Sequence, residues 1–144
     1  MRGSCSTSAP ASTAAAFYDT VLAPLGGSRQ MDFGEVIGFG TPDRPSFWVN
    51  PLADGINRPI HVAFVAADRA AVRAFFEAAV GAGAEVLHEP RVWPEYHPAY
   101  YGAFVRDPDG NNVEAVCHEP EVAELLAGDV LVFVASIDPV AEPG

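Results

Sequence analysis

The sequence is poor in cysteine and in positive charge. Its 144 residues include two cysteines, Cys5 and Cys117, which are too few for a disulfide framework and favour reduced thiols in the cytoplasm. Eight Lys and Arg residues stand against 19 Asp and Glu residues, and the formal net charge is -11. A charge of this sign argues against nucleic acid or an anionic membrane surface as a partner, and is compatible with a cation or a neutral small molecule.

Long apolar runs are also missing. No run approaches the roughly 20 apolar residues that span a bilayer, and the N-terminal residues lack the apolar segment of a signal peptide. The apolar fraction of 49% and the charged fraction of 19% are typical of a globular protein. We therefore expect a cytoplasmic protein with one hydrophobic core and no membrane partner.

A turn-rich motif between two β-prone runs is the clearest local feature that is present. Residues 107–111 (Asp-Pro-Asp-Gly-Asn) combine side chains that preset turn dihedral angles with side chains that cap their own backbone. Residues 101–105 and 113–117 flank this motif, so we predict a β-hairpin. Alternation along the second strand points Glu114 away from its apolar neighbours, toward a face where a ligand can bind.

The rest of the chain divides into two halves with the same predicted order of elements. The first half is predicted to hold a weak strand or no regular structure, then a helix and three strands, at residues 3–9, 11–22, 28–33, 36–39 and 46–50. After a linker at residues 51–59, the second half is predicted to hold a strand, a helix capped by Asp68, a short strand, a proline-rich loop and the hairpin. These lie at residues 60–66, 69–81, 84–87, 88–98 and 101–117.

The two halves also share a short sequence repeat. An aromatic pair followed by an acid occurs in each predicted helix, at Phe17-Tyr18-Asp19 and Phe75-Phe76-Glu77. We interpret this as duplication of a module of roughly 55 residues. The predicted fold is α+β, with two βαβββ modules whose mixed sheets form a cup around one cavity and whose helices lie outside. One domain is expected over residues 1–118, with modules at about residues 1–52 and 58–118.

Residues 119–144 form a C-terminal extension outside the repeat. Residues 121–126 favour one or two helical turns, and residues 129–137 are apolar and strongly β-prone. An exposed strand of this kind is an aggregation hazard, so we expect it to pair with a sheet edge of its own chain or of a second copy. A disordered tail is the alternative. We expect a homodimer.

Four segments carry a family resemblance, at residues 17–26, 61–64, 94–104 and 107–114. Together they resemble the vicinal oxygen chelate superfamily, which includes glyoxalase I, bleomycin-resistance proteins and extradiol dioxygenases. The resemblance covers residues 11–118, and the hairpin motif with its downstream glutamate is its most specific part.

The resemblance implies a metal site with two ligands from each module, one on the first strand and one on the last. The second module supplies His61 and Glu114, whose donor atoms suit Zn, Ni, Mn, Fe(II) or Co. Such an ion would act as a Lewis acid on neighbouring oxygens of a small substrate. The matching first-module positions are Gly3 and Trp48, so two of the four expected ligands are absent.

The resemblance supports a lyase or a dioxygenase of the glyoxalase type, although it leaves catalysis itself open. In this interpretation Glu114 is also the base, and His97 or Tyr101 assists proton transfer. Four aromatic residues are predicted to contact the substrate: Trp48, Phe33, Tyr96 and Tyr100.

Two other functions remain open at this point. The chain could be a metal-free protein that sequesters an aromatic or cationic compound between Trp48 and the Tyr100-Tyr101 pair, or a dimeric scaffold without a ligand. From the residues alone, His61 is equally consistent with a core histidine, and Glu114 with solvent exposure or pairing to an arginine such as Arg91 or Arg106.

Overall fold

The computed structural model describes residues 3–7, 11–51, 58–127 and 130–136, and it describes side chains over residues 12–51 and 58–120. Residues 52–57 of the predicted linker lie outside the described residues. The elements in chain order are β1 (Gly3–Thr7), α1 (Ala11–Leu22), the 3-10 turn η1 (Ala23–Leu25), β2 (Ser28–Asp32), β3 (Ile37–Thr41), β4 (Arg44–Pro51), β5 (His61–Val65), α2 (Arg69–Gly81), β6 (Val86–Val92), β7 (Tyr101–Arg106), β8 (Asn112–Cys117), β9 (Glu121–Ala127) and β10 (Val130–Ser136).

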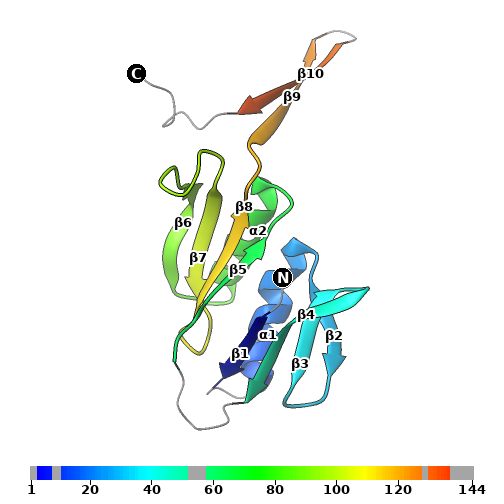
Figure 1. Ribbon diagram of the computed structural model, residues 1–144, viewed down its shortest axis with the longest axis vertical. Coiled ribbons are helices and arrows are strands. Elements are labelled where there is room, and N and C mark those ends of the chain that lie inside the picture. Colours follow the sequence, from blue (N-terminus) through cyan, green and yellow to red (C-terminus); the bar gives the residue numbers. More distant parts are fainter. Residues whose placement is uncertain (1–2, 8–10, 52–57, 128–129, 137–144) are drawn as a thin grey trace.

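Two four-stranded mixed sheets repeat one topology, and the α+β class is confirmed (Figure 1). The first sheet has the order β1-β4-β3-β2 and the second has the order β5-β8-β7-β6. In each, the first and last strands of the half pair in parallel at one side, and the remaining pairs are antiparallel. Each half therefore reads β-α-β-β-β, in the order predicted from the sequence.

The hydrophobic core lies between the helices and one face of each sheet. α1 packs against β4 and α2, while α2 packs against β7 and β8. Tyr18 of α1 is fully buried and contacts aromatic rings of both sheets, with centroid distances of 4.8 Å to Phe47 and 6.5 Å to Phe64. The start of α2 is fixed as predicted, because the Asp68 carboxylate accepts a 2.7 Å hydrogen bond from the Ala71 N–H. No helix in the described part of the chain is long and apolar enough to cross a membrane.

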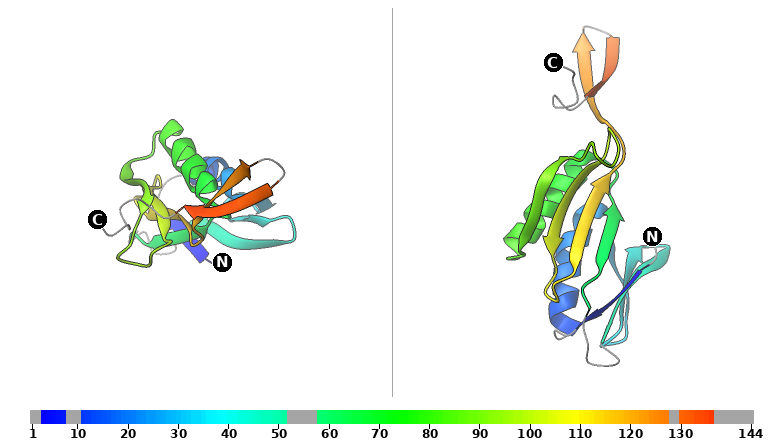
Figure 2. Two further views of the ribbon diagram at one scale, coloured as in Figure 1. Left: turned by 90° about the horizontal axis from the view of Figure 1, so that it is seen from above. Right: turned by 60° about the vertical axis from the view of Figure 1, so that its left-hand side comes forward.

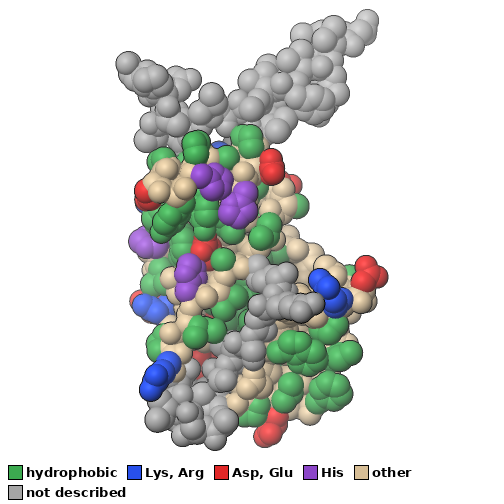
Figure 3. All heavy atoms as spheres, in the orientation of Figure 1, with side chains coloured by type: hydrophobic (Ala, Val, Ile, Leu, Met, Phe, Trp, Pro, Cys, Tyr) green, Lys and Arg blue, Asp and Glu red, His purple; other side chains and the backbone are tan. Residues whose placement is uncertain are grey.

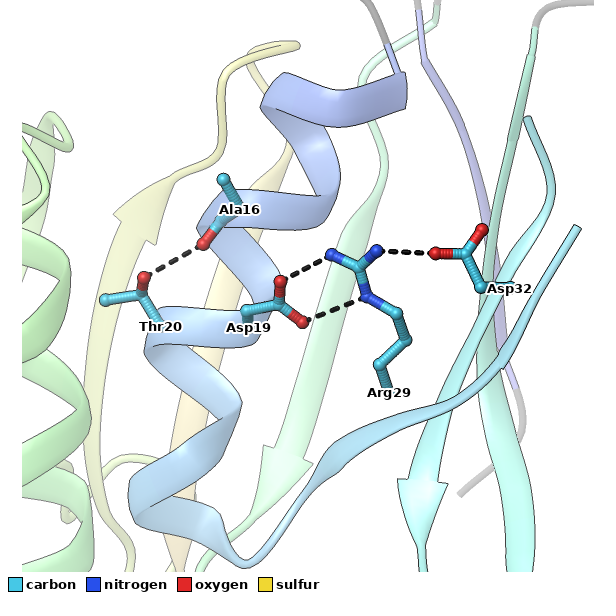
Figure 4. A network of polar contacts seen from close by, with 5 residues as sticks. All are labelled: Ala16, Asp19, Thr20, Arg29 and Asp32. Carbon is cyan, nitrogen blue, oxygen red and sulfur yellow. Dashed lines mark hydrogen bonds and ion pairs between the residues drawn. The ribbon is translucent and has the colours of Figure 1, made fainter. Parts of the chain in front are cut away.

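An exposed ion-pair network joins α1 to the first sheet (Figure 4). The Arg29 guanidinium of β2 donates to both carboxylate oxygens of Asp19, and its third nitrogen donates to Asp32 at 2.7 Å. The Asp32 carboxylate also accepts from the Gly34 N–H, at a turn residue with φ of +87° that only glycine adopts readily. Surface pairs of this kind orient elements more than they stabilise them.

A buried network ties the hairpin turn to both halves of the chain. The Tyr18 hydroxyl donates a 2.7 Å hydrogen bond to Asp107 Oδ2, and the backbone N–H groups of Asp109 and Asn111 donate to Asp107 Oδ1. The Asn111 side chain donates to Asp107 and accepts from the Ile60 N–H, immediately before β5. The turn that the sequence predicts is thus also the junction between α1, β5 and the β7–β8 hairpin.

Strand β6 extends further than the sequence suggests. Residues 88–98 were expected to form a loop, but β6 continues through Val92 and includes Pro90. Proline lacks an N–H and is tolerated here because β6 is an edge strand whose register shifts between His88 and Arg91. The prediction of a loop from residue 88 is therefore wrong for residues 88–92.

The C-terminal extension forms a separate antiparallel hairpin that projects beyond the end of β8 (Figures 1 and 2). The helical prediction for residues 121–126 is wrong, because β9 pairs along its whole length with β10. Such pairing satisfies backbone groups that a single short helical turn leaves open. The predicted strand at residues 129–137 corresponds to β10, and residues 129 and 137 lie outside the described residues.

Replacing Tyr18 by phenylalanine tests the junction. The change removes the hydroxyl that donates to the buried Asp107 carboxylate and keeps the ring in place, so we expect a loss of roughly 1.5–3 kcal/mol in the free energy of unfolding. Urea denaturation of both proteins measures the loss. Tyr96→Phe is the matched control, since Tyr96 is 59% exposed and should change stability little. Equal stability of Tyr18→Phe and Tyr96→Phe would contradict a structural role for this contact.

Candidate functional site

Glu114 lies near the middle of β8 and faces away from the helices. Its neighbours Val113 and Ala115 are completely buried in the core, as alternation along the strand requires. The Glu114 side chain is only 1% exposed even though it points to the other face of the sheet. A carboxylate in such a position needs hydrogen-bond partners, because burying it unpaired costs several kcal/mol.

Two side chains from neighbouring elements supply those partners. His61, the first residue of β5, places its Nε2 2.7 Å from Glu114 Oε2, although the two residues are 53 positions apart in the chain. The Tyr100 hydroxyl, immediately before β7, donates a short hydrogen bond to Glu114 Oε1. β8 lies between β5 and β7, so the sheet order itself brings the three side chains together.

The two partners differ in solvent exposure. The His61 side chain is 52% exposed, and its ring packs against Phe104 with a centroid distance of 5.9 Å. Burial, followed by the hydrogen bond to Glu114, raises the pKa of the Tyr100 hydroxyl above its ordinary value. Tyr100 therefore stays protonated near neutral pH and acts as a donor to the carboxylate.

Gly102 leaves room for this arrangement. It faces the site from β7, and a Cβ at this position would lie 3.3 Å from Glu114 Oε1 and 3.4 Å from Tyr100 Cε1. The Gly102 carbonyl also accepts a 3.1 Å hydrogen bond from Trp93 Nε1. The glycine thus admits the Tyr100–Glu114 contact and anchors an aromatic side chain beside it.

Aromatic rings form a wall next to the carboxylate. Tyr96 stacks on Trp93 at a centroid distance of 5.9 Å and packs edge-on against Tyr100 at 4.9 Å. The Arg91 guanidinium lies 3.4 Å from the centre of the Trp93 ring. Tyr96 is exposed, so this wall offers a surface on which a planar or carbonyl-bearing molecule can lie.

A histidine pair lies on the other side of Tyr100, and histidine side chains gather on this face of the second sheet (Figure 3). His97 Nε2 is 2.9 Å from His118 Nδ1, and both rings pack edge-on against the Tyr100 ring at 5.3 Å. Because the Ala99 N–H donates to His97 Nδ1, a neutral His97 carries its proton on Nε2 and donates to His118. His97 therefore touches the site through Tyr100, and none of its described contacts is with Glu114.

Two predicted site residues lie elsewhere. Tyr101 is on the opposite face of β7, where its ring packs under the guanidinium groups of Arg69 and Arg73 of α2, so it is separate from Glu114. Phe33 is 71% exposed at the β2–β3 turn, and none of the described contacts joins it to Glu114. The sequence identified the aromatic character of these positions but not the face on which each side chain lies.

In the first module, the two positions that correspond to the expected ligands, Gly3 and Trp48, lie on different faces of the sheet. Trp48 lies on β4 between the buried residues Phe47 and Val49, as Glu114 does between Val113 and Ala115 on β8. Its ring covers Gly38, where a Cβ would lie 2.9 Å from the indole. Gly3 pairs with Phe47, a core-facing residue, whereas the register partner of Trp48 is Ser4. Gly3 is therefore not the face equivalent of His61.

Among the side chains that the structure describes, the donor set at Glu114 does not fit a resident divalent ion. Across the described residues, no group of three or more His, Cys, Asp or Glu side chains converges in the manner of a metal site. His61 and Glu114 are two donors, whereas zinc sites use at least three protein ligands. The Tyr100 hydroxyl donates to Glu114, and His97 and His118 bond to each other, so none of these three side chains completes the set.

A pocket of about 210 Å³ lies away from these polar groups. It is bounded by the end of α1, by β3 and β4, and by β5, and its lining includes Leu22, Leu25, Phe39 and Phe64. Its lining has no titratable side chain. The polar groups around Glu114 therefore lie outside this pocket.

Comparison with known proteins agrees with this architecture. The model of the glyoxalase-like domain family matches residues 5–116. The chain belongs to the glyoxalase-like family. The predicted membership of the vicinal oxygen chelate superfamily is confirmed, and no protein with a curated description matches the chain.

Solved structures share the glyoxalase-like fold at low sequence identity. A glyoxalase/bleomycin resistance protein from Albidiferax ferrireducens T118 is 21% identical, with a TM-score of 0.68 over 81% of this chain and 97% of that chain. A lactoylglutathione lyase from Agrobacterium tumefaciens is 22% identical, with a TM-score of 0.59 over 81% and 92%. A glyoxalase-related enzyme from Fulvimarina pelagi is 16% identical, with a TM-score of 0.62 over 93% and 96%.

The raised pKa of Tyr100 gives a direct test of the glyoxalase-like site. We expect the absorbance of tyrosinate during alkaline titration to show a tyrosine that ionises above the ordinary value of about 10, and Tyr100→Phe should remove that step. Because the folded-state pKa is the higher one, the stability that Tyr100 contributes is complete below about pH 10 and is lost as the pH rises above it. Tyr96→Phe should keep the alkaline step. Persistence of the step in Tyr100→Phe would contradict the assignment.

Proposed function

We propose that the chain is a glyoxalase-type enzyme that transfers a proton on a small oxygen-bearing molecule, with His61 as the acid–base group and Glu114 as the residue that positions it. The 2.7 Å contact between a half-exposed imidazole and a buried carboxylate is the observation that supports this proposal. It reverses the roles expected from the sequence, in which Glu114 is the base.

The buried carboxylate sets the chemistry of the exposed ring. With Glu114 ionised, the protonated Nε2 of His61 donates a hydrogen bond to the carboxylate. Nδ1 then holds the lone pair that can accept a proton from a substrate. The imidazolium that results is stabilised by the adjacent negative charge. The Tyr100 hydroxyl holds the second carboxylate oxygen and thereby fixes the orientation of Glu114.

The proposed step is an isomerisation and needs no oxidant. His61 takes the proton from a hydroxyl-bearing carbon next to a carbonyl group, and the C–H electron pair forms the enediolate. The proton of that hydroxyl passes to the former carbonyl oxygen while the imidazolium returns its proton to the former carbonyl carbon, so the carbonyl and the hydroxyl exchange places. The wall of Trp93, Tyr96 and Tyr100 would hold the planar enediolate beside the imidazole. No step in this sequence passes through a metal ion.

Deuterium exchange tests this proposal. The purified chain would be incubated in D2O with a panel of small 2-hydroxycarbonyl and 2-oxocarbonyl compounds, including lactoylglutathione, and exchange at the carbon next to the carbonyl would be followed by NMR. We expect His61→Gln to slow exchange roughly 10²–10⁴-fold. Glu114→Gln should slow it roughly 10²-fold or more, because the amide no longer selects the reactive tautomer.

Controls separate the proposed mechanism from others. Glu77→Gln changes an exposed carboxylate on α2 and should leave the exchange rate unchanged. The pH dependence of the rate should show a histidine-like ionisation that is absent in His61→Gln. Stoichiometric bound metal in the wild type, lost together with exchange in Glu114→Gln, would contradict the metal-free step and support the ligand role that the family resemblance implies.

A metal-free binding protein is the second candidate. The observation in its favour is the exposed Tyr96 ring stacked over Trp93, because the faces of such rings bind aromatic or cationic ligands. Compounds of the panel that quench tryptophan fluorescence without any exchange would favour sequestration over catalysis.

The predicted cup, formed by the two mixed sheets around one cavity, is also part of this proposal. The faces of the two sheets that bear Trp48 and Glu114 are turned away from the core, and we infer that both border one ligand cavity. A homodimer, with β10 as a candidate contact strand, also remains a prediction.

A further inference from the structure

We propose that the N-terminal end of α2 carries a binding site for a small oxyanion, the phosphate or carboxylate group of a ligand, with Arg69 as its principal contact. The site is separate from Glu114 and independent of the function proposed above. It is an open pocket of about 310 Å³, lined by Asp68, Arg69, Arg73, Cys117 and Glu119 among others.

The burial and the unmet hydrogen bond of Arg69 are the observations that indicate a ligand. It is the first residue of α2, and only 6% of it is exposed. Its Nε atom is buried and has no hydrogen-bond partner within the described residues, and no ion pair of Arg69 is found there. A guanidinium keeps its charge at all physiological pH values, so it cannot lower the cost of burial by losing a proton.

Within the described residues, the surroundings of Arg69 supply further positive charge, and its Nε atom has no acceptor there. The Arg69 guanidinium carbon lies 5.0 Å from the centre of the Tyr101 ring, a contact that stabilises the cation without using its N–H groups. Arg73, one turn further along α2, adds a second charge and donates to the Tyr101 hydroxyl at 3.5 Å. The N-terminal end of the 13-residue helix adds the partial positive charge of its free N–H groups.

Neither acidic side chain of the pocket, Asp68 or Glu119, forms a described ion pair with Arg69. Asp68 uses its carboxylate as the helix cap, with Oδ1 2.7 Å from the Ala71 N–H. Glu119 is exposed, and its backbone N–H contacts the sulfur of Cys117. A phosphate or carboxylate group fits the unmet requirement, because two of its oxygens can accept parallel hydrogen bonds from one guanidinium.

The location makes this site distinct from the one at Glu114. Tyr101 separates the two, since its ring lies on the helix face of β7 whereas Gly102 and Glu114 face the opposite side. An anion at Arg69 would therefore bind next to α2 and would have no direct contact with His61 or Tyr100.

Titration with sodium phosphate tests the site, with sodium acetate as the carboxylate arm and sodium chloride at matched ionic strength as the reference. The Arg69 Nε–Hε resonance, assigned by its loss in Arg69→Lys, reports binding locally. We expect this resonance to shift saturably with phosphate, with acetate or with both, but not with chloride, and the melting temperature to rise with it. The arm that acts at the lower concentration identifies the chemical class.

Variants make the test selective. Arg69→Met should abolish the anion-dependent rise in melting temperature, and Arg69→Lys should weaken binding about tenfold, because a lysine cannot make the bidentate contact. Arg44→Gln, at an exposed position of β4, and Glu114→Gln should bind the anion as the wild type does. An Arg69 resonance that does not move, or an equal rise in melting temperature in Arg69→Met, would overturn the proposal.

Discussion

The carboxylate of Asp107 is the constraint on which the remaining structure depends. It accepts hydrogen bonds from the Tyr18 hydroxyl of α1, from the Asn111 side chain and from backbone groups of its own turn. Asn111 in turn accepts from the N–H of Ile60, at the entrance to β5. A short turn thereby fixes the register of β8 against both β7 and β5. The position of Glu114 follows from that register.

Burial of Glu114 explains why the reactive chemistry is expected on its neighbour. A carboxylate with 1% exposure cannot reach a substrate directly, but it can determine which nitrogen of His61 holds a proton. Tyr100, whose pKa is raised by burial and by this carboxylate, completes the hydrogen bonding of Glu114. The arrangement buries the carboxyl group and leaves the imidazole half-exposed.

The sequence predicts much of this fold because its strongest signals are local. The hairpin turn, the Asp68 cap and the strand alternation around Glu114 all depend on neighbours along the chain. His118 is not among the predicted site residues, although the same alternation places it on the face of Glu114. The face of Tyr101 depended on where β7 begins relative to β8, because a shift of one residue exchanges the roles of Tyr100 and Tyr101. The contact of His61 with Glu114 joins residues 53 positions apart, and only the family resemblance anticipated it.

The ionisation state and tautomer of His61 provide the most direct test of the account. Nitrogen-15 NMR of the labelled protein at neutral pH distinguishes a ring protonated on Nε2 from one protonated on Nδ1. Because Nε2 lies 2.7 Å from Glu114 Oε2, the account predicts that the neutral form of the ring carries its proton on Nε2, and that this preference is lost in Glu114→Gln. A neutral ring with its proton on Nδ1 in the wild type, unchanged by Glu114→Gln, would contradict it.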